Sequence, residues 1–366
     1  MKKLITIIIL LAAITAGTFV YFQMQKEDNV EIVPSFKPLI KVGLIYPTTG
    51  NSKHLGEAMK TALKLFEQDS KTKKSNYSFE LQVQDNQLNP TKTITIANKL
   101  KNIDQVDAYI TITNNIGSVV SLIADKNEVI HFAIANDQSV KGKYNFNIAT
   151  PPNKEAEKLL KELQKRGITK VALITQNQGK MLGISTAIRD QAKNYEVEII
   201  IDNITNTGDR DFSKIINKIK SDKPEIVIAQ LFAPELLAFA KQLKEIIPNS
   251  KITNIETMSL PDDKRLLEGD WYIDAATPNS SYIKSYQKES GSNITNDSEL
   301  AYTALQILRD SLDAVGSNKE DLIKYLTTGH EIKTVIGPIT YNQDGIMQSE
   351  ASIKQIRKGQ PILLKD

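Results

Sequence analysis

Residues 40–46 read IKVGLIY, and residues 55–66 read LGEAMKTALKLF. The first segment is an apolar run of strand length, whereas apolar residues in the second recur at helical spacing, through Ala58, Met59 and Ala62. A strand followed directly by an amphipathic helix is the repeating unit of parallel sheets. These two segments therefore predict the start of an α/β domain.

The same alternation continues along the chain, with one interruption. It runs to about residue 134, breaks at Thr150-Pro151-Pro152 and then starts again. Two series separated by a proline-rich break favour two similar lobes over one long sheet. A turn at residues 342–345, between expected strands at 337–341 and 349–357, predicts a hairpin near the end. The other expected strands are residues 40–46, 78–84, 106–112 and 129–134 in the first series and 170–175, 197–201, 225–230 and 251–255 in the second.

The N-terminus predicts export. Lys2 and Lys3 precede an apolar run at residues 4–22, which would span roughly 28 Å as a helix, close to the thickness of a bilayer core. Positive charge before an apolar run keeps the lysines on the cytoplasmic side of the membrane and places the rest of the chain on the opposite side. We expect residues 1–25 to be an uncleaved membrane anchor or, alternatively, a cleaved signal ending near residues 15–17. Residues 26–38 are expected to be a linker.

Composition excludes several classes of protein. The 46 basic and 43 acidic residues are spread without a basic block, so nucleic acid is not an expected partner. The chain has no cysteine, which rules out both disulfides and a lipidated N-terminal cysteine. Removing residues 1–38 leaves 328 residues, more than one hydrophobic core usually supports.

Signatures of catalysis and metal binding are also missing. The three histidines, His54, His131 and His330, have no metal-ligand spacing, and no nucleophile-elbow, dinucleotide or phosphate-loop motif occurs. We therefore expect no enzyme activity, no catalytic residues, no metal and no cofactor. An exported enzyme without a motif is the least favoured alternative.

Short motifs that occur in a fixed order resemble one known family. They are Ile40-Lys41-Val42-Gly43, Tyr46-Pro47-Thr48-Thr49-Gly50, Leu55-Gly56, the acidic turn from Asp85 to Pro90, Asp211-Phe212, Pro234-Glu235 and the segment from Thr334 to Gly345. In this order they resemble the type I periplasmic solute-binding proteins, specifically the branched-chain amino-acid (Leu/Ile/Val) receptors of ABC transporters.

The resemblance implies two Rossmann-like lobes with parallel central sheets, joined by three hinge crossings. The crossings are expected near residues 149–153, 276–279 and 328–335. Residues 39–150 and 277–330 would form lobe 1, and residues 151–276 and 331–366 would form lobe 2.

The resemblance also implies a ligand site, which is carried over position by position. The loop that should hold a ligand carboxylate contains Asn114, Asn115, Gly117 and Ser118, and the loop after the fourth strand contains Asn136 and Asp137. Asp137 departs from the family, because a neutral hydroxyl is expected there and an acid would repel a carboxylate.

Four further positions belong to the same expected site. Leu55 and Lys180 stand where family members carry aromatic residues, while Phe232 keeps an aromatic. Glu256 matches the acid that holds the ligand ammonium. The competing interpretation makes Asn114 and Asn115 an ordinary loop tip and Glu256 a surface acid.

The implied function is an extracytoplasmic binding protein, at the cell surface or in the periplasm, that closes over a small polar ligand such as an amino acid or an amide. Its partners would be the ligand, an ABC permease or sensor subunit, and the membrane through residues 4–22. The alternative is a ligand-independent or regulatory interaction module of the cell envelope on the same fold.

Overall fold

The computed structural model describes residues 37–136, 139–261, 263–292, 294 and 298–364. Residues Leu39–Asp366 form one compact unit with hydrophobic cores of its own, so this unit can be studied without the residues before it. The apolar segment at 4–22 lies outside the described residues, and its role as an anchor stays a prediction. Within the described ranges, no helix combines the length and the apolarity needed to cross a membrane.

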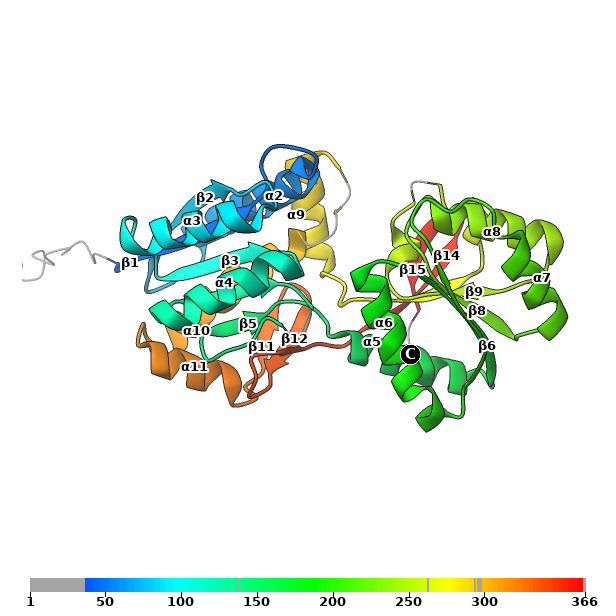
Figure 1. Cartoon of the computed structure of the whole chain (residues 1–366). Helices are drawn as coiled ribbons and strands as arrows, with labels where there is room; N and C mark the ends of the chain where they lie inside the picture. The colour runs from blue at the N-terminus through cyan, green and yellow to red at the C-terminus, as the bar shows by residue number, and fades with distance from the viewer. Residues whose placement is uncertain (1–36, 137–138, 262, 293, 295–297, 365–366) are drawn as a thin grey trace, which may run out of the picture. The chain divides into compact units, whose positions relative to one another are not determined.

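The first lobe is built on a five-stranded parallel sheet in the order β2-β1-β3-β4-β5 (Figure 1). All residues of β3 and β4 are buried, which explains why these strands are mostly apolar on both faces rather than alternating. The strands are β1 (Leu39–Tyr46), β2 (Ser78–Asp85), β3 (Ala108–Ile112), β4 (Ile130–Ile134) and β5 (Asn145–Asn147).

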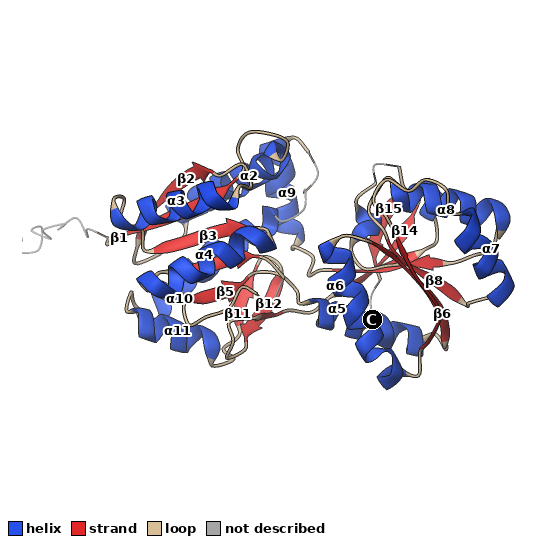
Figure 2. Ribbon diagram, in the orientation of Figure 1, coloured by secondary structure: helices blue, strands red, loops and turns tan. Residues whose placement is uncertain are grey.

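Helices cover both faces of this sheet (Figure 2). Neighbouring residues of β1 point to opposite sides: Leu44 joins the larger core and Ile45 the smaller one. The larger core contains α2 (Lys53–Thr72), α9 (Ser280–Ser290), α10 (Ser298–Val315) and α11 (Lys319–Thr327), and the smaller core contains α3 (Pro90–Asn102) and α4 (Asn114–Asn127).

The second lobe repeats this plan with a four-stranded parallel sheet in the order β7-β6-β8-β9. As in the first lobe, the second strand along the chain lies at the edge and the first lies beside the third. Its strands are β6 (Lys170–Gln176), β7 (Glu198–Thr205), β8 (Ile226–Gln230) and β9 (Ile252–Thr253); α5 (Pro152–Lys165) and α6 (Gly179–Ala192) belong to one core and α7 (Ser213–Asp222) and α8 (Glu235–Ile246) to another.

A small antiparallel sheet completes the second lobe. It has the order β10-β14-β15, and Ile273 of β10 forms a bridge with Ile255, just after β9. These elements are β10 (Trp271–Asp274), β14 (Ser352–Arg357) and β15 (Gln360–Leu363), with the short 3₁₀ turns η1 (Lys193–Tyr195), η2 (Thr257–Ser259) and η3 (Arg265–Leu267) elsewhere in the lobe.

The third crossing differs from the expected one. We expected the chain to cross near 328–335 and residues 331–366 to belong to the second lobe. Instead, Ile332, Ile339 and Met347 are buried in the large core of the first lobe. Their burial holds β11 (Ile332–Thr334), β12 (Gly337–Tyr341) and β13 (Met347–Gln348) there, and the chain reaches the second lobe only between β13 and β14.

The expected terminal hairpin has a different second strand. The turn is present: the side chain of Asn342 accepts hydrogen bonds from the backbone N–H groups of Asp344 (3.1 Å) and Ile346 (2.9 Å). This tight turn pairs β12 with the two-residue β13, not with residues 349–357. Strand β14 pairs with β10 and β15 instead. The predicted fold class, an α/β protein of two lobes with parallel central sheets, is confirmed.

Candidate ligand-binding site

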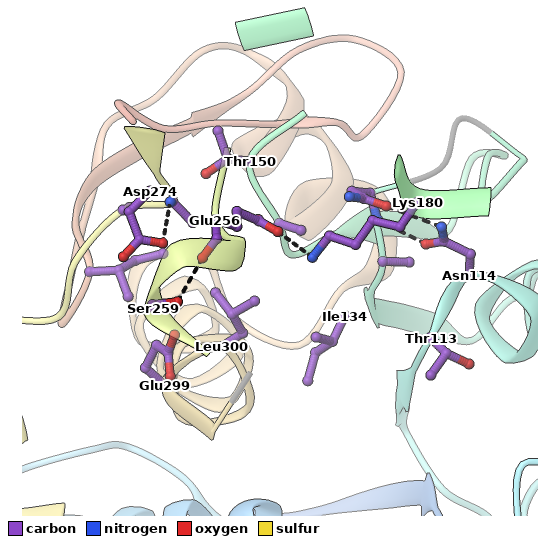
Figure 3. A pocket seen from close by; sticks show the side chains of 16 residues that line it. Thr113, Asn114, Ile134, Thr150, Lys180, Glu256, Ser259, Asp274, Glu299 and Leu300 are labelled. Carbon is purple, nitrogen blue, oxygen red and sulfur yellow. Dashed lines mark hydrogen bonds and ion pairs between the residues drawn. The ribbon is translucent and has the colours of Figure 1, made fainter. Parts of the chain in front are cut away.

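A cavity of about 230 Å³ lies at the carboxyl ends of strands from both lobes. This is the edge at which open α/β sheets bind ligands. Its lining from the first lobe includes Thr113 and Asn136, and that from the second lobe includes Lys180, Glu256 and Asp274 (Figure 3).

The first lobe presents the start of helix α4 to the cavity. Thr113, which directly precedes the helix, has φ 75° and ψ 150°, and its side chain makes no capping hydrogen bond. The N–H groups of a first helical turn have no partner within the helix and carry a partial positive charge. This end of the cavity is therefore suited to an anionic group such as a carboxylate.

Two asparagines fix the loops on this side. The amide nitrogen of Asn114 donates to the side-chain oxygen of Asn136 (3.1 Å), and the backbone N–H of Asn136 donates to the side-chain oxygen of Asn114 (3.0 Å). This reciprocal pair ties the loop after β3 to the loop after β4. Asn114 thus has a structural role in addition to lining the cavity.

The second lobe presents a carboxylate that already holds a cation. Glu256 follows β9 with φ 67° and ψ −43°, and its carboxylate forms an ion pair with Lys180 in the first turn of α6 (Figure 3). About a fifth of the Glu256 side chain is exposed, compared with 39% for Lys180. Burial alone would raise the pKa of Glu256, but the charge of Lys180 and hydrogen bonds with Lys180 and Glu155 outweigh burial and lower it.

Two more acids and a lysine lie around Glu256. Asp274, at the end of β10, pairs with Lys354 at 2.6 Å; burial raises its pKa, and Lys354 opposes that shift. Glu155, in the first turn of α5, is fully buried. Burial, followed by the charge of Glu256, holds the pKa of Glu155 well above its usual range, with Lys180 opposing. This side of the cavity is rich in carboxyl groups and can hold an ammonium group.

The structure brings together four of the ten residues expected at the site. Asn114, Asn136, Lys180 and Glu256 all line the cavity. Asp137 lies outside the described residues. The ligand-binding roles of all ten remain predictions.

The other five expected residues do not line this cavity. Asn115, Gly117 and Ser118 continue into α4, and Gly117 allows close packing because a Cβ atom there would meet Val140 and Ala133. Leu55 packs against the core of the first lobe. Phe232 packs against the core of the second lobe.

Sequence reasoning missed several lining residues. Asp274 is the last residue of β10, a short strand that the alternation did not predict, and Glu299 and Leu300 lie in the first turn of α10. Thr113 directly precedes the loop residues that were expected at the site, but nothing in a threonine predicts a positive φ. Glu155, which is buried behind the lining, was also missed, because an acid in a first helical turn normally faces solvent and interacts favourably with the helix dipole.

Comparison with known proteins identifies the family. The sequence model of a family described as "Periplasmic binding protein" matches residues 39–361. The chain belongs to this family. It is a solute-binding, extracytoplasmic and non-enzymatic class of proteins.

Individual relatives agree with this assignment. The Leu/Ile/Val-binding protein BraC3 of Rhizobium johnstonii is 25% identical over 341 residues, which cover 87% of this chain and 92% of that protein. The branched-chain amino-acid transporter binding protein LivJ of Streptococcus pneumoniae, solved with isoleucine, superposes with a TM-score of 0.73 at 15% identity, covering 90% of this chain and all of that one.

A third relative was solved with a different ligand. A solute-binding protein from Rhodopseudomonas palustris, in complex with 3,4-dihydroxybenzoic acid, has a TM-score of 0.75 at 18% identity, covering 89% of this chain and 96% of that one. The shared architecture thus includes proteins solved with ligands that differ in whether they carry an amine. Fold alone does not select between these ligands.

Proposed function

We propose that this protein captures a small zwitterion, an amino acid or a close analogue, outside the cytoplasm and presents it to an ABC permease or a sensor subunit. One observation carries the proposal: the uncapped start of α4 and the carboxylate of Glu256 line the same cavity. The ligand carboxylate would meet the N–H groups of α4, and its ammonium would meet Glu256. The names of the relatives, which include receptors for leucine, isoleucine and valine, support this ligand class.

The charges around the cavity favour a ligand with an amine over a purely anionic one. Glu256, Asp274 and Glu299 line the cavity, whereas the lysines nearby are Lys180, in the lining, and Lys354, behind Asp274. In the described part of the chain, these three carboxyl groups outnumber the two lysines by one. An aromatic acid without an amine would add a further negative charge.

Replacement of Glu256 by Gln tests the proposal. Removal of the charge leaves a ligand ammonium without its partner in a partly desolvated site, which costs about 2–5 kcal/mol. We expect Glu256→Gln to weaken the binding of neutral amino acids by more than tenfold in titration calorimetry, with the fold unchanged by circular dichroism. Glu245→Gln, at an exposed position of α8, is the matched control and should bind as the wild type does. Equal affinities for the two variants would remove Glu256 from the site.

We also propose that residues 4–22 remain as a membrane anchor. The support is the length of the apolar run and the charged residues on both sides of it. The full chain should then fractionate with membranes and resist carbonate extraction. N-terminal sequencing that begins near Thr18 would instead show a cleaved signal and a free receptor.

A further inference from the structure

The ammonium position of the proposed site is occupied by the protein itself. Lys180 reaches from the first turn of α6 to the carboxylate of Glu256. A ligand ammonium that takes the same carboxylate competes with Lys180 for it. A lysine side chain on its flexible stem can move, but leaving its charge unpaired in a cavity is costly. A second acceptor close to Lys180 would therefore favour binding.

Glu155 is placed to be that acceptor. Among the described residues, no N–H or hydroxyl donor reaches either of its carboxyl oxygens, although the side chain is fully buried. After burial, the charge of Glu256 has the largest effect on Glu155, and a buried carboxyl group beside a carboxylate favours its protonated form. Lys180 is also close enough for its charge to act on Glu155.

The charged groups facing Glu155 come from each neighbouring element. They are Lys180 from α6, Glu256 from the loop after β9, and Asp274 from β10 with its partner Lys354 from β14. On α5 itself, Lys154 is exposed and pairs with Glu157. The 3₁₀ turn η1 packs near the far end of α5, where Tyr195 acts on Lys161.

We propose that an amine-bearing ligand displaces Lys180 from Glu256, that Lys180 moves to the carboxyl of Glu155, and that the proton of Glu155 leaves to solvent. Two ion pairs then replace one ion pair and one protonated carboxyl group, and one proton is released for each ligand bound. This inference rests on the proposed function, because it requires that the ligand carries an ammonium group. It makes Lys180 an internal competitor that sets the affinity for amines.

The direction of the pH dependence follows from this exchange. Glu155 is protonated in the free protein and ionised in the complex, so affinity for amines rises as pH rises. The rise approaches tenfold per pH unit between the pKa of Glu155 in the complex and its higher pKa in the free protein. Above the latter pKa, affinity becomes independent of this group.

Titration calorimetry of residues 37–366 with L-leucine, L-isoleucine and L-valine tests the exchange. Each titration is repeated in buffers of different ionisation enthalpy, which counts the protons released. The wild type should release about one proton per ligand at a pH where Glu155 is protonated. Lys180→Met should bind about tenfold tighter and release none, because the competitor is gone and Glu155 keeps its proton. Glu155→Gln should also release none, and should bind more weakly than the wild type.

Two control variants and three contrary outcomes make the test decisive. Lys218→Met on α7 and Glu157→Gln on α5 should both release the proton as the wild type does. Binding without proton release in the wild type, or weaker binding by Lys180→Met, would overturn the exchange while leaving the proposed function intact. If none of the three amino acids binds to the wild type or to Lys180→Met, the proposed function fails, and the exchange fails with it.

Discussion

Two residues of the cavity adopt backbone conformations that their side chains disfavour. Thr113 and Glu256 both have positive φ, in regions where residues other than glycine cost about 1–3 kcal/mol. Both directly follow buried segments of their lobes and line the cavity. Such strain persists only where the surrounding structure enforces it, and it is concentrated at ligand sites. One strained residue, Thr113, precedes the helix start that can accept an anion, and the other, Glu256, carries the carboxylate. Their positions support this cavity as the ligand site.

His131 is a buried polar residue that does not line the cavity. His131 on β4 is fully buried, and its Nδ1 and Nε2 lie 2.7 Å from Asn145 Oδ1 and 2.8 Å from Thr111 Oγ1. With Nδ1 donating and Nε2 accepting, the neutral ring satisfies both partners. Burial lowers the pKa of His131 from 6.5 to about 4, with the bond to Asn145 opposing the shift.

This depressed pKa predicts acid sensitivity. The unfolded chain protonates this histidine near pH 6.5, whereas the folded protein does so only near pH 4. The unfolded state therefore binds more protons in this window, and stability falls as pH decreases through it. We expect His131 to account for a loss of about 2–3 kcal/mol between pH 7 and pH 4.5.

Urea denaturation of the wild type and His131→Gln at the two pH values isolates the contribution of His131 from that of the carboxyl groups. The difference in unfolding free energy between the two proteins should shrink at the lower pH. A difference that stays the same at both pH values would show that His131 does not titrate in this way.

At the level of single residues, the sequence predicted the site positions that family motifs mark, but not the others. Asn114, Asn136, Lys180 and Glu256 were expected at the site and line the cavity. The carboxyl of Glu155 could not be predicted, because its burial depends on how α5 packs on α6 and β10. The pairing of Lys180 with Glu256 was not predicted either, since these residues are far apart in the chain and meet only through the second lobe.

Among the elements, those with long periodic patterns were predictable and short ones were not. The alternation predicted β1 to β4, β6 to β9 and the helices between them. It missed β5, whose sequence is Asn-Phe-Asn, because its burial comes from neighbours rather than from its own apolarity. The segment β11 to β13 was assigned to the wrong lobe. Its apolar residues are compatible with either core, and contacts such as Tyr341 on Phe146, with ring centroids 5.4 Å apart, decide between them.

The turn between β12 and β13 depends on glycine for two reasons. Gly345 has φ 70°, and a Cβ atom there would overlap the backbone oxygen of Asn145. The carbonyl of Gly345 also accepts a hydrogen bond from the N–H of Asn147 (2.9 Å), which fixes this turn against β5. The close approach of two backbones leaves no space for a side chain.

We therefore expect Gly345→Ala to lower the free energy of unfolding by about 2–4 kcal/mol. Gly359→Ala is the matched control, since Gly359 has φ 68° but open space around its Cα, and it should cost only about 1 kcal/mol. Denaturant unfolding of both variants measures the difference. Equal losses would mean that the turn does not dock on β5 as described.

At the scale of the whole molecule, the same strand order occurs in both lobes, and the chain passes between the lobes three times. Ligands of such proteins contact both lobes only when the lobes close, so binding shifts the equilibrium between open and closed forms. The repeated series and the proline-rich break made two lobes predictable from the sequence. The last crossing was not predictable, because no compositional signal marks residues 349–351.

The central claim, that this chain is a receptor for a small amine-bearing solute, is tested most directly by ligand-linked stability. Residues 37–366 are melted with each of a set of amino acids, amides and nucleosides, and scattering is recorded for those that shift the transition. We predict that at least one neutral amino acid at 100 times its Kd raises the unfolding free energy by roughly 2.7 kcal/mol and lowers the radius of gyration. Unchanged melting and scattering across the whole set would contradict the account and favour an interaction module that needs no ligand.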